Sequence, residues 1–222
     1  MKPIFEGEVY EMLPKSDGIV FSYCRGVEDN NVTVGFKMLS FENGSLVDVA
    51  KNIYLVTKFG SNYRAAVRVC ENYITSKAVV LPNDKLFIVS AGGQAYIADI
   101  TGDIDWSGEI GYRNCPPNDI AFYNNALWAS FANENALIRF NPNTMREELK
   151  VGGKRSPFDA PKDIFIDGAT AVVCNNGSNK LIKINLDSYA VEEYKQFEER
   201  PHSYLKIGKF EFVLLDSGIY LI

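Results

Sequence analysis

Histidine is nearly absent from this sequence and the cysteines are widely spaced, which excludes several kinds of site. The chain has one histidine, His202. A single imidazole excludes a zinc site built on two or more histidines and leaves one possible histidine general base. The four cysteines, Cys24, Cys70, Cys115 and Cys174, form no C-x-x-C motif. We therefore expect reduced thiols, most of them packed as small apolar side chains.

A basic cluster and a long apolar run are also missing. The formal net charge is −5, and the densest basic feature is the pair Lys154-Arg155, which gives no electrostatic footprint for nucleic acid. No stretch approaches the roughly 18 uncharged apolar residues of a membrane span, and Glu6-Gly7-Glu8 interrupts the N-terminal segment where a signal peptide is apolar. These absences predict a cytoplasmic protein with no nucleic-acid partner and no membrane partner. They leave its oligomeric state open.

The common catalytic signatures are absent as well. The sequence has no G-x-S-x-G motif and no cysteine beside a plausible base, and Gly92-Gly93 lacks the glycine spacing of a phosphate-binding loop. The sequence therefore predicts no catalytic residue and favours a protein that is not an enzyme.

The most informative feature that is present is an internal repeat. Residues 116–153 and 160–197 superpose without a gap at an offset of 44 residues. The offset pairs Pro117 with Pro161, Asp119 with Asp163, and Asn141 with Asn185. In the first unit, short apolar segments at 120–122, 126–131, 136–140 and 147–151 are separated by asparagine-rich turns. Each unit is therefore expected to form four short strands.

Weaker copies of the unit extend over the rest of the chain, at 79–111, at 200–222 and within the first 55 residues. Five units of about 44 residues nearly account for the 222 residues, and this period is typical of one propeller blade. We predict an all-β single domain, a closed β-propeller of five four-stranded blades. The expected blades are 11–55, 56–112, 113–154, 155–199, and 200–222 completed by residues 2–10. Segment 56–77 is expected to contain the inner strand of the second blade, and the N-terminal strand to close the last blade.

The P-x-D-I-x-F and L-I-x-[FI]-N patterns of the repeat resemble the NHL-type and YVTN-type propellers and, more distantly, the gluconolactonase/senescence-marker family. Members of the gluconolactonase group place asparagine and aspartate at the mouth of the central channel, where these residues bind a divalent cation and the substrate. Pro117-Asn118-Asp119 is similar to such a segment. The resemblance therefore implies Asn118 and Asp119 as ligands of Ca²⁺ or another divalent cation.

The repeat also indicates where a binding site is expected. Asn118, Lys162 and His202 occupy equivalent positions in three units, so we expect them, with Asp119 and Asp163, at the channel mouth. The favoured hypothesis is a non-catalytic module, without a cofactor, that binds a protein or a small molecule there. The alternative is a metal-dependent hydrolase of gluconolactonase type, and a carbohydrate-binding or carbohydrate-cleaving propeller is a third reading. A purely structural reading also stays open, in which each aspartate caps its turn through backbone N–H groups.

Overall fold

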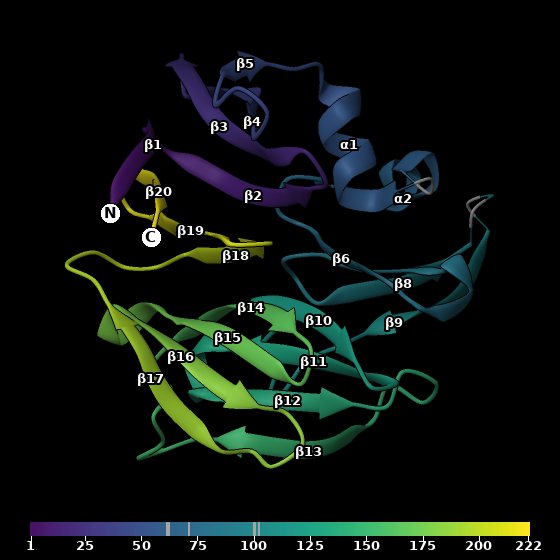
Figure 1. Cartoon of the computed structure of the whole chain (residues 1–222). Helices are drawn as coiled ribbons and strands as arrows, with labels where there is room; N and C mark the ends of the chain where they lie inside the picture. The colour runs from purple at the N-terminus through teal and green to yellow at the C-terminus, as the bar shows by residue number, and fades with distance from the viewer. Residues whose placement is uncertain (61–62, 71, 100, 102) are drawn as a thin grey trace.

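Five antiparallel sheets of four strands each surround a common centre (Figure 1). The computed structural model describes residues 1–60, 63–70, 72–99, 101 and 103–222, except the side chains of residues 65 and 83. The inner strands are β2 (Val9–Lys15), β6 (Lys77–Val80), β10 (Asp119–Tyr123), β14 (Pro161–Asp167) and β18 (Ser203–Ile207). The predicted all-β fold with five four-stranded blades is confirmed.

Each blade runs outward from its inner strand. The first continues through β3 (Gly18–Glu28), β4 (Asn31–Ser40) and β5 (Leu46–Asp48), and the second through β7 (Leu86–Val89), β8 (Gln94–Ala98) and β9 (Ile104–Glu109). The third continues through β11 (Ala126–Phe131), β12 (Ala136–Phe140) and β13 (Glu147–Gly152), and the fourth through β15 (Thr170–Asn175), β16 (Lys180–Asn185) and β17 (Val191–Gln196). Short 3-10 turns lie at Pro82–Asp84, Ala132–Glu134 and Asn176–Ser178. Strands β10 to β13 match, to within one residue at each end, the four segments predicted within residues 116–153.

The 44-residue repeat is visible in turn chemistry as well as in strands. Asn135 and Asn179 both adopt left-handed backbone conformations, with φ of 50° and 57°. Asn141 Oδ1 accepts backbone N–H groups two and three residues on, and Asn185 Oδ1 does the same. Asparagine suits both roles because its short side chain tolerates the left-handed region and mimics a backbone turn.

The last blade is completed from the N-terminus. Strand β1 (Lys2–Glu6) pairs antiparallel with β20 (Gly218–Leu221), which follows β19 (Phe210–Leu215). The ring of Phe5 lies 5.0 Å from that of Phe21 and 5.2 Å from that of Tyr23, so β1 also packs against the first blade. The predicted closure by an N-terminal strand is confirmed, with the difference that Val9 and Tyr10 already belong to β2.

The prediction for segment 56–77 is wrong in the part that the structure describes. Two helices, α1 (Lys51–Phe59) and α2 (Tyr63–Val69), stand between the first and second blades, and the inner strand begins only at Lys77. Residues 61, 62 and 71 of this segment lie outside the described residues. Helix α1 buries Tyr54, Leu55 and Phe59, a spacing that follows the helical period and not strand alternation. These side chains fill the space between the two blades together with Val20, Leu86 and Ile88.

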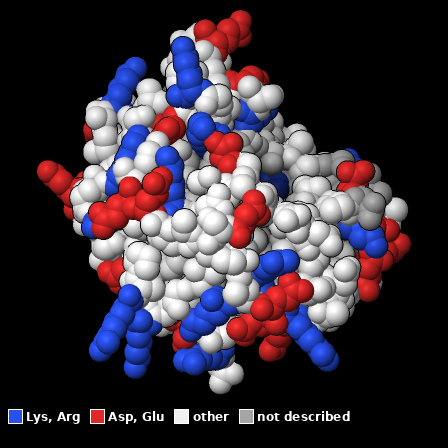
Figure 2. Space-filling view, turned by 60° about the horizontal axis from the view of Figure 1, so that its bottom comes forward, with Lys and Arg blue, Asp and Glu red and all other residues white. Residues whose placement is uncertain are grey.

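Apolar residues that alternate along the strands form the core between neighbouring blades. One cluster joins Phe87 of the second blade to Leu127 and Phe131 of the third, and another joins Trp128 of the third to Val173 and Ile182 of the fourth. No helix among the described residues is long and apolar enough to cross a membrane. On the face seen in Figure 2, acidic and basic side chains are interspersed.

Candidate functional site

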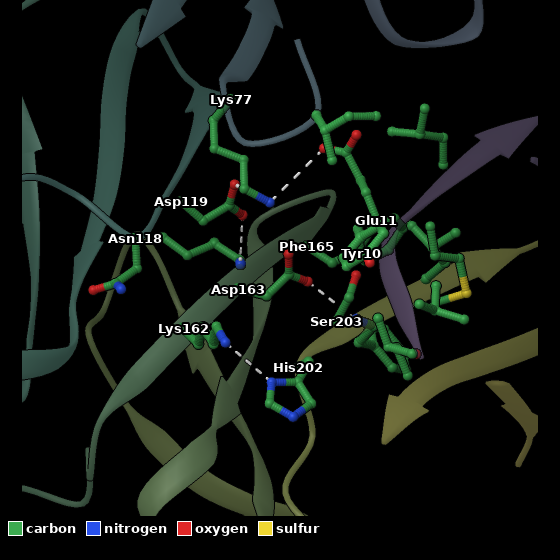
Figure 3. A pocket seen from close by; sticks show the side chains of 18 of the residues that line it. Tyr10, Glu11, Lys77, Asn118, Asp119, Lys162, Asp163, Phe165, His202 and Ser203 are labelled. Carbon is green, nitrogen blue, oxygen red and sulfur yellow. Dashed lines mark hydrogen bonds and ion pairs between the residues drawn. The ribbon is translucent and has the colours of Figure 1, made fainter. Parts of the chain in front are cut away.

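A cavity of about 610 Å³ opens where the inner strands of the five blades begin. Its wall includes residues of β2, β6, β10, β14 and β18, together with Lys58 of α1. All five residues predicted at the channel mouth line it, as Figure 3 shows: Asn118, Asp119, Lys162, Asp163 and His202. The structure therefore brings them together, and their part in ligand binding stays a prediction.

The two aspartates connect each blade to the next one. Asp119 Oδ2 accepts a hydrogen bond from Ile164 N at 2.9 Å, and Asp163 Oδ2 accepts one from Tyr204 N at 3.0 Å. Each carboxylate thus holds the inner strand of the following blade. The structural reading of the P-x-D motif places these bonds within the aspartate's own turn; each aspartate does accept a backbone N–H, but that group belongs to the neighbouring blade.

The inner strands contribute two further charged residues that sequence reasoning missed. Lys77 Nζ lies 3.6 Å from Asp119 Oδ1 and 3.9 Å from Glu11 Oε1. Burial opposes the charge of Lys77, but the carboxylates of Asp119, Glu11 and Asp163 outweigh it and raise the lysine's pKa. Burial, reinforced by the Asp119 carboxylate, also raises the pKa of Asp163, to about 7. Three acidic side chains, Glu11, Asp119 and Asp163, therefore form a ring of acids that lines the channel, and Lys77 lies among them.

Helix α1 adds a buried ion pair to this ring. Lys58 Nζ donates to Glu11 Oε2 at 2.7 Å and to the carbonyl oxygen of Tyr73 at 2.8 Å. The Tyr54 hydroxyl donates to the same carboxylate oxygen of Glu11. Burial lowers the pKa of Lys58 and the Glu11 carboxylate opposes that shift. The helical insertion thus has a second role beside packing, because it neutralises Glu11.

A sequence signal for Glu11 existed. Glu11 pairs with Ser22 and Asp119 pairs with Ser130, in both cases eleven positions further along the chain. That spacing aligns the first blade with the third and makes Glu11 the counterpart of Asp119. The same argument could not identify Lys77, because the inner strand of the second blade was expected within residues 56–77, where the structure has the end of α1 and all of α2.

The lone histidine belongs to a polar cluster at the cavity wall. His202 Nε2 lies 2.6 Å from Asp216 Oδ1, and His202 Nδ1 lies 3.1 Å from Lys162 Nζ and 3.3 Å from Asn176 Nδ2. The aspartate can only accept and the lysine ammonium can only donate, so the imidazole carries its proton on Nε2 and accepts at Nδ1. Burial lowers the pKa of His202, and the charge of Lys162 lowers it further against the pull of Asp216.

Asp216 is neutralised from its other side. Arg200 Nε donates to Asp216 Oδ2 at 3.0 Å. The bond from Arg200, more than that from His202, lowers the pKa of Asp216 to about 2. Asp216 is thus a permanent carboxylate that orients the imidazole.

The resemblance to gluconolactonases implies a cation at Asn118 and Asp119, and the contacts of these residues do not fit one. Asn118 Oδ1 accepts the backbone N–H of Ala132 at 2.8 Å. One oxygen of Asp119 accepts Ile164 N, and the other faces the Lys77 ammonium. Within the described residues, no group of three or more His, Cys, Asp or Glu side chains is arranged to hold a metal ion. The Lys77 ammonium thus faces the oxygen of Asp119 that a divalent cation would need as a ligand.

The closed ring of five sheets and the polar cavity at its centre define the class: the chain is a five-bladed β-propeller. It matches no protein-family model and no curated protein sequence. Among solved structures it is similar to virginiamycin B lyase from Staphylococcus aureus, with 15% identity, a TM-score of 0.53 and coverage of 95% of this chain and 64% of that one. A streptogramin B lyase gives 15% identity, a TM-score of 0.53 and coverage of 96% and 65%.

A third similar structure is a protein of unknown function from Bacteroides caccae, with 12% identity, a TM-score of 0.53 and coverage of 94% of this chain and 70% of that one. The chain therefore spans somewhat less than two thirds of the length of the two lyases. At these identities the likeness concerns the fold alone.

Proposed function

We propose that this propeller is a binding module that takes a small polar ligand in the cavity at its channel mouth. The observation that carries the proposal is the convergence of charged side chains from all five blades on one cavity of about 610 Å³. Concave sites of roughly 300–1,000 Å³ with a few convergent polar groups are where proteins usually bind small molecules.

The cluster around His202 favours binding over base catalysis. A general base needs a lone pair directed at the substrate. In this cavity the Nδ1 lone pair of His202 faces the Lys162 ammonium at 3.1 Å, and its Nε2 proton is directed at Asp216. Both ring nitrogens are thus engaged within the protein, so His202 has no free lone pair for a general base and serves instead to orient the Lys162 ammonium.

The lyase neighbours make an enzymatic role the natural competitor of this proposal. One of them is a histidine-to-alanine variant of virginiamycin B lyase with quinupristin, and it is described as catalytically inactive.

The gluconolactonase-like alternative needs a divalent cation. Melting curves with EDTA and with added Ca²⁺, Mg²⁺ or Mn²⁺ measure that requirement, because a cation that binds only the folded protein raises the Tm. We expect no shift with any of these ions, and a rise that Asp119→Ala removes would favour the hydrolase.

Filling the cavity tests the binding proposal itself. Ser203 lines the cavity at the start of β18, and Ser203→Phe places an aromatic ring in it. The same substitution at Ser107, an exposed residue of the outermost strand β9, is the matched control. In a ligand-detected NMR screen of small polar compounds, we expect the hits of the wild-type protein to persist with Ser107→Phe and to disappear with Ser203→Phe. Hits that survive in both variants, or a screen without hits, would contradict the proposal.

A further inference from the structure

Two charged side chains of opposite sign face the cavity without an ion pair. Among the described residues that line it, Glu11 is paired with Lys58, Lys77 lies beside Asp119, and Asp216 is paired with Arg200. Apart from the exposed Glu8, this leaves Lys162 and Asp163, for which no oppositely charged group lies within 4.0 Å. They are consecutive residues of β14.

Asp163 is buried, with 8% of its surface exposed; it accepts a hydrogen bond from Tyr204 N at 3.0 Å and shares a second hydrogen bond with the carboxyl group of Asp119. The groups that face it are the carboxylate of Asp119 on β10, the ammonium of Lys77 on β6 and the thiol of Cys174 on β15. Burial and the neighbouring carboxylate disfavour its charge, and Lys77 compensates only in part. A cationic group of a ligand at this place would stabilise the ionised carboxylate.

Lys162 is in the opposite situation. Its contact in the cavity is the neutral acceptor His202 Nδ1, at 3.1 Å. Burial lowers its pKa, and the positive charges of Lys77 and Arg200 lower it further, against the weaker pull of Asp163 and Asp216. An anionic group of a ligand beside Lys162 would offset these like charges.

We propose that the cavity binds a small zwitterion, a molecule with a carboxylate at one end and a primary ammonium at the other. The carboxylate pairs with Lys162, and the ammonium pairs with Asp163. This inference rests on the proposed function and names its ligand class. A ligand with two anionic ends would bring one of them against Asp163 and the ring of acids, and a ligand with two cationic ends would bring one against Lys162. One molecule with both charges satisfies both residues.

The test uses amino acids of increasing length and their half-molecules. The full chain is titrated with glycine, β-alanine and γ-aminobutyrate, and with propionate and n-propylamine, which each keep one of the two charged ends. We expect at least one amino acid to bind at least tenfold more tightly than propionate and n-propylamine. Because the ligand's ammonium favours ionised Asp163, its affinity should fall as the pH is lowered through about 7.

Variants assign the two ends of the ligand. Asp163→Asn keeps an acceptor for Tyr204 N and should remove the advantage of the amino acid over propionate. Lys162→Met should remove its advantage over n-propylamine. Lys206→Met, at an exposed lysine of β18 that pairs with Asp167, is the control and should leave all affinities unchanged.

The outcomes separate this inference from the proposed function. The zwitterion inference fails if the amino acids bind no more tightly than one of the half-molecules. It also fails if wild type and both variants bind the amino acids equally. In either case the cavity remains a binding site. If no amino acid binds, but other compounds bind the wild-type protein and not Ser203→Phe, the zwitterion inference again fails and the cavity again remains a binding site. If no compound of any charge responds to Ser203→Phe, the proposed function itself fails.

Discussion

His202 illustrates how single residues set the chemistry of the cavity. Its two neighbours have fixed roles, since Asp216 accepts and Lys162 donates, and this pattern selects one tautomer of the imidazole. The ring is therefore held neutral between a cation and an anion. The same residue in bulk water would exchange freely between its forms.

The pKa of His202 can be measured without assignment because the chain has one histidine. We expect a value below 6.5, since burial and Lys162 both disfavour the imidazolium. Lys162→Met should raise this pKa by removing the like charge, and Asp216→Asn should lower it by removing the hydrogen bond and the counter-charge. An NMR pH titration of the imidazole protons gives all three values. An unchanged pKa in Lys162→Met would contradict the contact on which the tautomer assignment rests.

Asp163 makes the stability of the fold depend on pH. Its pKa is raised from 3.8 to about 7 in the folded protein, so the folded state binds more protons than the unfolded state between these values. Stability is then greatest below about pH 4 with respect to this group and falls as the pH rises toward 7, by up to about 1.4 kcal/mol per pH unit. Urea unfolding of Asp163→Asn should show a weaker decline over that window. Parallel curves for wild type and variant would show that Asp163 is not the group that titrates.

Among the elements, β1 closes the ring. It supplies the fourth strand of the last blade and brings Phe5 against Phe21 and Tyr23 of the first blade. Without it, β20 would present an unpaired edge. The contacts of β1 therefore join the two ends of the chain.

Truncating Phe5 tests this role with little change to the strand pairing. Phe5→Ala removes a half-buried ring at the junction of the two blades and should cost about 2 kcal/mol, or roughly 5 °C in Tm. Lys2→Ala changes an exposed residue of the same strand and should stay within about 0.5 kcal/mol of wild type. Thermal melting compares the two. Equal Tm values would mean that the Phe5 ring does not contribute to closure.

At the scale of the whole molecule, the sequence predicts the architecture better than the site. The gapless repeat of the third and fourth blades was sufficient for blade number and strand pairing, because both units obey the same turn chemistry. The second blade was harder to place, because α1 and α2 interrupt the period between β5 and β6. The charged residues at the channel could therefore not all be identified from the sequence alone. Lys77 and Lys58 were identified only from the positions of β6 and α1 in the structure.

The ring of acids, with Lys77 among them, is also the reason why we expect no divalent cation in this cavity. Lys77 places a covalently attached cation among Glu11, Asp119 and Asp163. Because the Lys77 ammonium already supplies positive charge to these carboxylates, they need no free metal ion to balance their charge. The unpaired charges that remain, on Lys162 and Asp163, are then available to a ligand.

The central claim is that the channel mouth is the place where this propeller binds its ligand, and a map of amide chemical shifts tests it most directly. Isotope-labelled protein is titrated with the compounds that bind wild type in the screen. The account predicts that the largest shifts gather at Asn118-Asp119, Lys162-Asp163 and His202-Ser203, which lie far apart in sequence and line one cavity. Shifts gathered instead on the outermost strands or on the outer face of α1 and α2 would contradict it.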